Sequence, residues 1–562
     1  MENHEVARIL RETANLLEVD GADIGRYRSY ERAAQTIENL SERVEERARA
    51  GTLTELAGIG DRMAAHIQDI LKTGKYGHHR KLLKKYPHTI LDLLTLPSLG
   101  PKKTALLWKK FKAGTVEEVE KLARAAKLRA LAGFGEKTEQ NILKGIEMYK
   151  RQAGRFHLDD ADRAARDLLA YIEALGKSVQ KVIPAGSLRR GKETIGDVDV
   201  LLVTQNVRQV TAHVLRYPKI EQVWAKGPDK ISFQLDNALR MQVRPFAEKS
   251  FGAALQYFTG SREHNIALRA RAKERGWKLS EYALATLKGG RIVASRSEQE
   301  IYAKLGLAYI EPELRENAGE IEAAEQGRLP RLVAARDIRG DLQMHTTASD
   351  GKNSIEEMAA AAKKLGYEYI ALTDHSKAVT VANGMDEKRT LQQIKKIRRA
   401  QKKFNGIRLL AGIEVDILKD GRLDLDDEVL TQLDVVVASV HSYMNLEPAA
   451  MTERLLRALE NPHLMILAHP TGRLLLRRDP FEFDFEQVLA AAARRGIALE
   501  CNAFPDRLDL RDVHLRMAKE RGVKIVISTD SHSTTHLPFM KYGVLMARRG
   551  WLEKRDVLNT LP

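Results

Sequence analysis

Cysteine is almost absent from this sequence: Cys501 is the single cysteine among 562 residues. One cysteine excludes an intramolecular disulfide framework. No apolar run approaches the roughly 20 residues needed to cross a bilayer, so no membrane partner is expected. The N-terminal segment has the pattern of an amphipathic helix and lacks the basic-then-apolar order of a secretion signal. These absences together predict a cytoplasmic protein.

Acidic residues are too few to balance the basic ones, and the formal net charge is +16. A polyanionic partner would explain this excess, and so would a merely solubilising surface. The distribution of charge favours the partner. Between Leu71 and Lys112 there are eleven Lys or Arg against one acid, Asp92. A charge run is usually a solvated face, but this one overlaps motifs suited to a DNA backbone.

Three short passages, residues 56–60, 96–100 and 131–135, resemble each other. Each joins two helical patterns through a turn whose glycines can adopt positive φ, and a helix begins directly after it. Such a turn exposes backbone N–H groups and a helix N-terminus, which suit a phosphate. Three ordinary packing corners are the alternative, but Lys137 and other lysines just past the turns favour helix-hairpin-helix modules that grip DNA. The expected DNA contacts are Gly58, Gly60, Gly100, Lys102, Lys103, Gly133 and Gly135.

The length of the chain predicts two to four domains. Helical patterns indicate two all-α helix-hairpin-helix domains, at 1–80 and 81–152. Short β-type runs between helices predict an α+β domain at 153–315, and the polar segment 316–336 is predicted to be a linker. Over 337–562, apolar strands alternate with helices, which is typical of a distorted α/β barrel.

The most specific signal of the α+β domain is a turn followed by two aspartates. Gly186 and Ser187 open a helix, where backbone N–H and hydroxyl groups can hold a triphosphate, and Arg190 adds a planar fork for phosphate. Asp197 and Asp199 are two apart on a strand and therefore point to the same face. Together they can bridge two Mg²⁺ (or Mn²⁺) ions for in-line phosphoryl transfer. A lone pair of this kind is usually a surface feature, but the preceding turn makes the signal strong.

These residues, with Gly196, resemble the palm motif of the family X DNA polymerases, which are nucleotidyltransferases. The segment 257–265 resembles the family's nucleotide-selecting motif. The resemblance implies that the incoming dNTP is lined by Tyr257, Phe258, Gly260 and Asn265. Core packing is the ordinary role for the two aromatic side chains. The resemblance implies that Asp197 and Asp199 are the catalytic carboxylates.

The sequence departs from the family at the third catalytic carboxylate, where Gln242 stands. Glutamine offers a carbonyl ligand but no charge and no proton acceptor. A general base and the charge of a metal ligand typically contribute on the order of 10²–10⁴-fold to the rate. Asp236 is the nearest upstream acid, and we expect it in a hairpin turn, out of reach. We predict weak or absent polymerisation, with nucleotide and DNA binding preserved. A second departure is His66, which stands where relatives with lyase activity carry an imine-forming lysine, so lyase activity is not expected.

The last domain is rich in residues that bind metals. Eight of the sixteen histidines lie in it, and several directly follow apolar strands. A single buried histidine is more often a packed core residue than a ligand, but packing explains this convergence poorly. Imidazole and carboxylate together suit Zn²⁺ or Mn²⁺. The candidate ligands are His345, Asp350, His375, Glu414, His441, His469, Asp530 and His532.

This pattern resembles the PHP (polymerase and histidinol phosphatase) domain, a distorted barrel that holds up to three metals. The resemblance implies three ligand groups: His345, Glu414 and Asp530; Glu414, His441 and His469; and Asp350, His375 and His532. Gln343 stands where the general motif has a further histidine. Arg473 and Arg507 are candidate phosphate contacts, with ordinary surface roles equally open.

The resemblance covers nearly the whole chain in the family's order. It implies a bacterial DNA repair enzyme that fills gaps in base excision repair and trims 3′ ends through its PHP domain. Whether it also cuts abasic sites stays open. The expected partners are gapped or 3′-ended DNA and dNTPs, and a monomer is expected. The alternatives are a polymerase-defective end-processing nuclease, favoured by Gln242, and a phosphatase of the histidinol-phosphate type, which the basic helical region argues against.

Overall fold

The structure is a computed structural model, and it describes residues 1–562 except 2, 39, 41–42, 97 and 153. The chain forms two compact units, residues 1–153 and 154–562. The predicted boundary at 152–153 includes a residue outside the described ones. The described part of the chain contains no helix with the length and hydropathy of a transmembrane segment.

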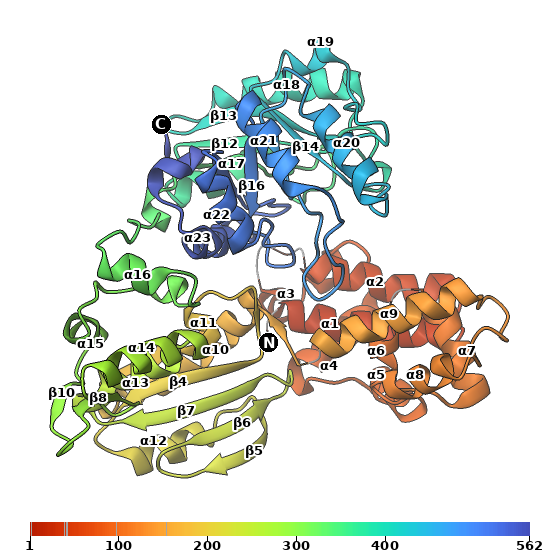
Figure 1. The fold of residues 1–562 in the computed structure, drawn as a ribbon. Helices are drawn as coiled ribbons and strands as arrows, with labels where there is room; N and C mark the ends of the chain where they lie inside the picture. Colours follow the sequence, from red (N-terminus) through yellow and green to blue (C-terminus); the bar gives the residue numbers. More distant parts are fainter. Residues whose placement is uncertain (2, 39, 41–42, 97, 153) are drawn as a thin grey trace. The chain divides into compact units, whose positions relative to one another are not determined.

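The described residues of the first unit form only helices and turns, as predicted (Figure 1). Its core is built from apolar residues spaced by about one or two helical turns, such as Ile67 and Ile70 on one helix and Leu10 and Leu17 on another. Its α-helices are α1 (Asn3–Val19), α2 (Ile24–Glu38), α3 (Val44–Ala50), α4 (Asp61–Thr73), α5 (Gly77–Lys85), α6 (Ile90–Leu93), α7 (Pro101–Phe111), α8 (Val116–Arg124) and α9 (Glu136–Gln152).

The three predicted hairpins precede α4, α7 and α9. The first and third hairpins have positive φ at Gly58 (78°) and Gly133 (81°), and the second has Ser98 (66°) at this position. The second glycine of the hairpin is different: Gly60 and Gly100 are extended N-cap residues with negative φ. Positive φ is therefore confirmed at the first glycine of the first and third hairpins, and Gly60 and Gly100 do not adopt it. Pro97 of the second hairpin lies outside the described residues.

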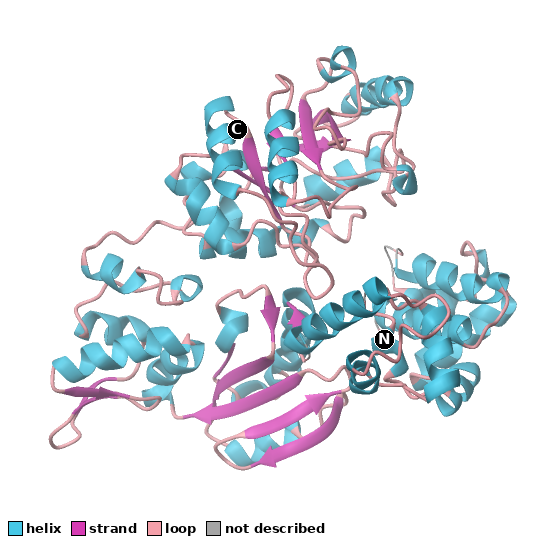
Figure 2. Cartoon of the chain, turned by 45° about the vertical axis from the view of Figure 1, so that its right-hand side comes forward, coloured by secondary structure: helices cyan, strands magenta, loops and turns pink. Residues whose placement is uncertain are grey.

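The second unit contains a five-stranded sheet in the order β2-β4-β7-β6-β5. Its strands are β2 (Lys181–Pro184), β4 (Asp197–Val203), β5 (Ile220–Lys226), β6 (Ile231–Leu235) and β7 (Arg240–Phe246). Figure 2 draws strands as magenta arrows. Alternate residues of β4 face opposite sides, because successive side chains of a strand alternate. Val198 and Val200 pack with α10 (Leu158–Glu173) and α12 (Val207–Val214), whereas Leu201 packs with α13 (Phe251–Thr259). Asp197 and Asp199 share the side of Leu201.

A smaller helical and β module follows. It contains α14 (Arg262–Glu274), β8 (Trp277–Leu279), β9 (Leu284–Thr286), β10 (Ile292–Ala294), α15 (Glu298–Lys304) and α16 (Glu320–Glu325). Part of the segment predicted as a linker packs into this module. Glu320 of this segment is fully buried, and its Oε1 lies 2.6 Å from His264 Nδ1. Arg315, which directly precedes the segment, is fully buried against Glu298. Polar residues there are paired inside the protein instead of solvated.

Seven parallel strands in sequence order form the last module. They are β11 (Gly340–Asp341), β12 (Tyr369–Leu372), β13 (Arg408–Asp416), β14 (Val435–Ser439), β15 (Ile466–Leu467), β16 (Ala498–Asn502) and β17 (Ile525–Ser528). A bridge between Met344 and Ser531 brings the two edges together, so the sheet is a nearly closed barrel. The connecting helices surround it (Figure 1): α17 (Ile355–Lys364), α18 (Glu387–Gln401), α19 (Asp427–Leu430), α20 (Pro448–Ala458), α21 (Phe485–Arg495), α22 (Asp512–Glu520) and α23 (Met540–Arg549). The predicted fold class is confirmed in all three parts.

Candidate functional site

The carboxyl ends of the barrel strands gather a cluster of imidazoles and carboxylates. His375, His441 and His469 follow β12, β14 and β15, and Asp530 follows β17, while Glu414 lies within β13. Parallel strands end at the same rim of a barrel, so residues far apart in sequence meet there. A cavity of about 240 Å³ opens at this rim and is lined by seven of the eight candidate ligands.

Glu414 lies at the centre of the cluster and is 1% exposed. Its Oε2 is 3.4 Å from His345 Nε2 and 3.4 Å from His375 Nδ1. Its Oε1 is 3.2 Å from His469 Nε2 and 3.6 Å from His441 Nε2. One carboxylate therefore reaches four imidazoles, which is the geometry of a bridging ligand.

Asp530 and Asp350 complete the cluster on the other side. Asp530 Oδ1 is 3.1 Å from His345 Nε2, and Asp350 Oδ2 is 3.4 Å from His532 Nε2 and 3.8 Å from His375 Nε2. The groups of ligand atoms close enough to share an ion are His345, Glu414 and Asp530; His375, Glu414 and His441; and His345, Asp350, His375 and His532. The implied assignment of ligands to three ions stays a prediction, since His375 and His345 each belong to two of these groups.

The donor set fits metal ions. His345 Nδ1, His375 Nδ1 and Glu414 Oε2 are buried without a hydrogen-bond partner, which is costly unless another ligand satisfies them. Burial lowers the pKa of His375 to about 3, so its ring is neutral at pH 7 and free to bind a cation. Both amide atoms of Gln343 are likewise buried and unpartnered, and its carbonyl offers a further ligand.

Two aspartates support the cluster from behind. Asp416 accepts hydrogen bonds from the backbone N–H of His441 at 3.0 Å and lies 3.2 Å from its Nδ1, leaving Nε2 to face Glu414. Asp374 accepts bonds from Thr346 and Ser349 and so holds the loop between His345 and Asp350. Sequence reasoning missed Asp416. Its position two residues after Glu414 on the same strand was the available signal, because such residues share a face.

Metal removal is expected to destabilise the second unit. Binding to the folded state alone stabilises a protein by about 2.7 kcal/mol when the free ligand is at 100 times its Kd. Adding Zn²⁺ or Mn²⁺ to chelator-treated protein should therefore raise its Tm in differential scanning calorimetry. An unchanged thermogram, with no heat of metal binding, would contradict the assignment of these residues as ligands.

The palm aspartates face Gln242 across the sheet. Asp199 pairs in register with Gln242 on β7, and Gln242 Nε2 donates to Asp197 Oδ2 at 3.1 Å. Burial, and next the charge of Asp197, raise the pKa of Asp199 to about 6. A divalent cation would relieve this repulsion, so the pair fits a metal. Asp236 lies exposed in the turn between β6 and β7, as predicted.

A fixed cation stands beside these carboxylates. Arg244 donates to Gln242 Oε1 at 2.9 Å, its Nε is 3.8 Å from Asp199 Oδ1, and its guanidinium lies 4.6 Å from the Phe258 ring centre. Glutamine thus bridges Asp197 and Arg244, and the site holds one carboxylate fewer than the family's pattern.

The residues predicted to select the nucleotide lie near the turn that opens at Gly186. Gly186 has φ 63°, and a Cβ there would lie 3.3 Å from Asp199. Asn265 joins two helices by donating to the Tyr257 carbonyl at 2.7 Å. Arg190 pairs with Glu316 at 3.0 Å, so a bound triphosphate would have to displace or share this contact.

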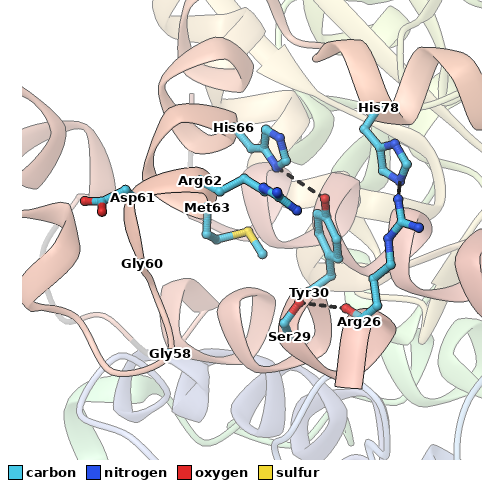
Figure 3. A pocket seen from close by; sticks show the side chains of 10 residues that line it. All are labelled: Arg26, Ser29, Tyr30, Gly58, Gly60, Asp61, Arg62, Met63, His66 and His78. Carbon is cyan, nitrogen blue, oxygen red and sulfur yellow. Dashed lines mark hydrogen bonds between the residues drawn. The ribbon is translucent and has the colours of Figure 1, made fainter. Parts of the chain in front are cut away.

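A pocket of about 660 Å³ opens beside the first hairpin in the N-terminal unit. Figure 3 shows Tyr30 facing His66 and Arg26 pointing to His78. The Tyr30 hydroxyl lies 3.3 Å from His66 Nδ1, and Arg26 Nη2 lies 3.2 Å from His78 Nε2. The other residues lining it are Ser29, Gly58, Gly60, Asp61, Arg62 and Met63. None of these ten residues is a lysine.

The hairpins leave open space at the glycines assigned to DNA. A Cβ added at Gly60, Gly100 or Gly135 would meet no atom within 4 Å. Lys102 is exposed at the start of α7, whereas Lys103 is partly engaged by the Ser98 carbonyl at 3.1 Å.

Replacing Lys102 with Ala is expected to weaken binding to any DNA sequence. Each lost phosphate contact should reduce the slope of log affinity against log salt by about 0.9. Fluorescence anisotropy over a salt series measures this slope. The exposed Lys121 on α8 provides a matched control, and an equal change with Lys121→Ala would count against the hairpin assignment.

Comparison with protein families gives four matches in chain order. Residues 1–76 match a helix-hairpin-helix domain, and residues 90–147 match a SAM-like helix-hairpin-helix tandem. Residues 254–316 match the DNA polymerase beta thumb, and residues 341–503 match the PHP domain. The fold and its sites therefore define a protein that joins helix-hairpin-helix modules, a polymerase-type module and a PHP domain.

Individual relatives agree with this class. The chain is 40% identical over 561 residues to the DNA polymerase/3′-5′ exonuclease PolX of Bacillus subtilis, covering 100% of this chain and 97% of the relative. It is 28% identical over 304 residues to rat DNA polymerase lambda, covering 46% of this chain and 48% of the relative. It is 33% identical over 202 residues to a probable phosphatase of Acetivibrio thermocellus, covering 34% of this chain and 78% of the relative. The chain belongs to the PolX family.

Proposed function

We propose that this protein is a DNA repair enzyme whose barrel removes nucleotides from DNA 3′ ends. The observation that carries the proposal is the convergence of four imidazoles on Glu414, with Asp350 and Asp530 beside them. The bound ions would be Zn²⁺ or Mn²⁺, up to three, and they would activate water and stabilise the leaving alkoxide. Water adds to the terminal phosphorus and the bond to O3′ breaks, which releases a nucleoside 5′-monophosphate.

The remaining modules present the substrate. The hairpin residues hold the DNA backbone without reading sequence, which suits gapped or 3′-ended DNA. The palm would hold a dNTP with Mg²⁺ or Mn²⁺ at Asp197 and Asp199, through Gly186, Ser187, Arg190, Gly196, Tyr257, Phe258, Gly260 and Asn265. A monomer that fills gaps in base excision repair is the expectation from the family.

Polymerisation by this palm is proposed to be weak. With Gln242 in place of the third carboxylate, the site has two carboxylates, and the cation of Arg244 lies beside Asp199. The protein would then act mainly as an end-processing nuclease with a palm that binds nucleotide and DNA.

A phosphatase acting on a small molecule is the second candidate, because PHP relatives described as probable phosphatases cover this part of the chain. The exposed hairpins and Lys102 argue against it, since a soluble metabolite needs no grip on DNA. Comparing hydrolysis of a labelled oligonucleotide with that of histidinol phosphate, with Mn²⁺ present, separates the two. Faster turnover of histidinol phosphate would overturn the nuclease proposal.

A further inference from the structure

The loop after β16 borders the candidate metal centre. It carries Arg507, whose Nε lies 3.4 Å from Asp530 Oδ2 and whose side chain lines the same cavity as His441 and His469. Its Nη1 is buried and has no hydrogen-bond partner. A guanidinium with a free donor beside metal ligands is suited to a phosphate oxygen, because its fork matches phosphate geometry.

This loop is held by Arg473. The Arg473 side chain is buried, with 6% of the residue exposed. Its Nε donates to the Arg507 carbonyl at 3.0 Å, and its Nη2 donates to the Leu508 carbonyl. The candidate phosphate contact assigned to Arg473 from sequence is therefore replaced by a role inside the protein.

The partner of Arg473 comes from the nucleotidyltransferase module. Glu193 Oε1 lies 2.9 Å from Arg473 Nη2. Glu193 sits between the triphosphate turn and Asp197 in the sequence. A buried guanidinium left without its counter-ion is strongly unfavourable, so Glu193 keeps Arg473 in place.

Another side chain of the same module contacts the loop directly. His157, the N-cap residue of α10, has its Nδ1 3.1 Å from Asp506 Oδ1. Asp506 is the neighbour of Arg507. The module thus reaches this short loop at the rim of the barrel in two ways: directly, from His157 to Asp506, and indirectly, from Glu193 through Arg473.

We propose that the nucleotidyltransferase module completes the nuclease site: Glu193, acting through Arg473 and supported by His157, positions Arg507 to contact the scissile phosphate. Arg507 is the group that touches the substrate, and Glu193, Arg473 and His157 are positioning residues. The inference rests on the proposed nuclease function of the barrel. It makes the hydrolytic site a composite of two modules.

The test is a double-mutant cycle on the full-length, Mn²⁺-loaded protein. Arg507→Ala should lower kcat/KM for removal of a 3′ nucleotide by about 10²–10³-fold, because it removes a donor to the developing charge. Glu193→Gln should lower it about tenfold, within the range of coupled neighbours, and the double variant should equal Arg507→Ala alone. Arg473→Lys keeps the charge but loses the fork, so it should resemble Glu193→Gln. Glu221→Gln, at an exposed position on β5, is the matched control and should leave the rate unchanged.

Binding of the product class gives a readout separate from turnover. Calorimetry should show weaker binding of thymidine 5′-monophosphate in Arg507→Ala and in Glu193→Gln, with metal content unchanged in both. Fully multiplicative losses in the double variant, or wild-type rates in both Glu193→Gln and Arg473→Lys, would overturn the inference. If the wild-type protein leaves DNA ends intact, that result contradicts the proposed nuclease function itself, on which this inference rests.

Discussion

Replacing Gln242 with Asp is expected to raise Mg²⁺-dependent primer extension by about 10²–10⁴-fold. Gln242 pairs in register with Asp199, and its amide contacts Asp197, so an aspartate there would add a third carboxylate to the site. The new carboxylate would also pair with Arg244, which now donates to the glutamine carbonyl. Single-nucleotide insertion on a gapped primer-template measures the gain.

Two further variants make this result specific. Gln242→Asn keeps an amide and should give no gain. Adding Asp199→Ala to Gln242→Asp should abolish the gain, because the remaining carboxylates cannot hold the ions. Robust Mg²⁺-dependent synthesis by the unaltered protein would contradict the account of an impaired palm.

Replacing Glu414 with Gln is expected to reduce removal of 3′ nucleotides by about 10³-fold. The change keeps the shape of the side chain but removes the charge that faces His345, His375, His441 and His469. Loss of a bridging carboxylate should also lower the number of ions bound, which elemental analysis would record.

His463→Ala is the matched control for this experiment. This histidine lies in the same barrel module but outside the cluster, and its backbone N–H is bound by Asn461. Its replacement should leave both metal content and excision unchanged. Normal excision by a Glu414→Gln protein with a full set of ions would show that Glu414 is not the central ligand of the site.

The sequence was most informative where a local pattern determines the three-dimensional position. Residues such as His441 and His469 follow apolar strands directly, and parallel strands end at one rim, so their convergence could be expected from the alternation of strands and helices alone. The alternation of β4 placed Asp197 and Asp199 on one face for the same kind of reason. The glycines of the hairpins were recognised by their repetition, although Ser98 shows that a turn of this kind also accepts a serine at positive φ.

Contacts between distant segments could not be predicted in this way. Nothing near Glu193 in the sequence indicates that it would pair with Arg473 in another module. Glu320 was assigned to a polar linker, whereas it is fully buried and pairs with His264. A charged residue is compatible with burial when its counter-ion arrives from elsewhere in the fold, and composition alone does not reveal that.

In the palm, too, one contact between side chains could not be predicted from the sequence. The substitution at Gln242 was visible from the motif, and its chemical consequence followed from the side chain. That Arg244 would occupy the space beside Asp199 depended on the packing of its guanidinium against Phe258. Sequence therefore indicated a missing carboxylate, and the structure added the neighbouring cation.

The most direct measurement is shortening of a gapped DNA labelled at its 5′ end, with Mn²⁺ and no dNTP. The unaltered protein and an Asp199→Ala variant should both shorten the labelled strand one nucleotide at a time, while His441→Ala should leave it intact. Shortening that persists in His441→Ala, or that depends on Asp199 instead, would show that the barrel rim is not where DNA ends are hydrolysed.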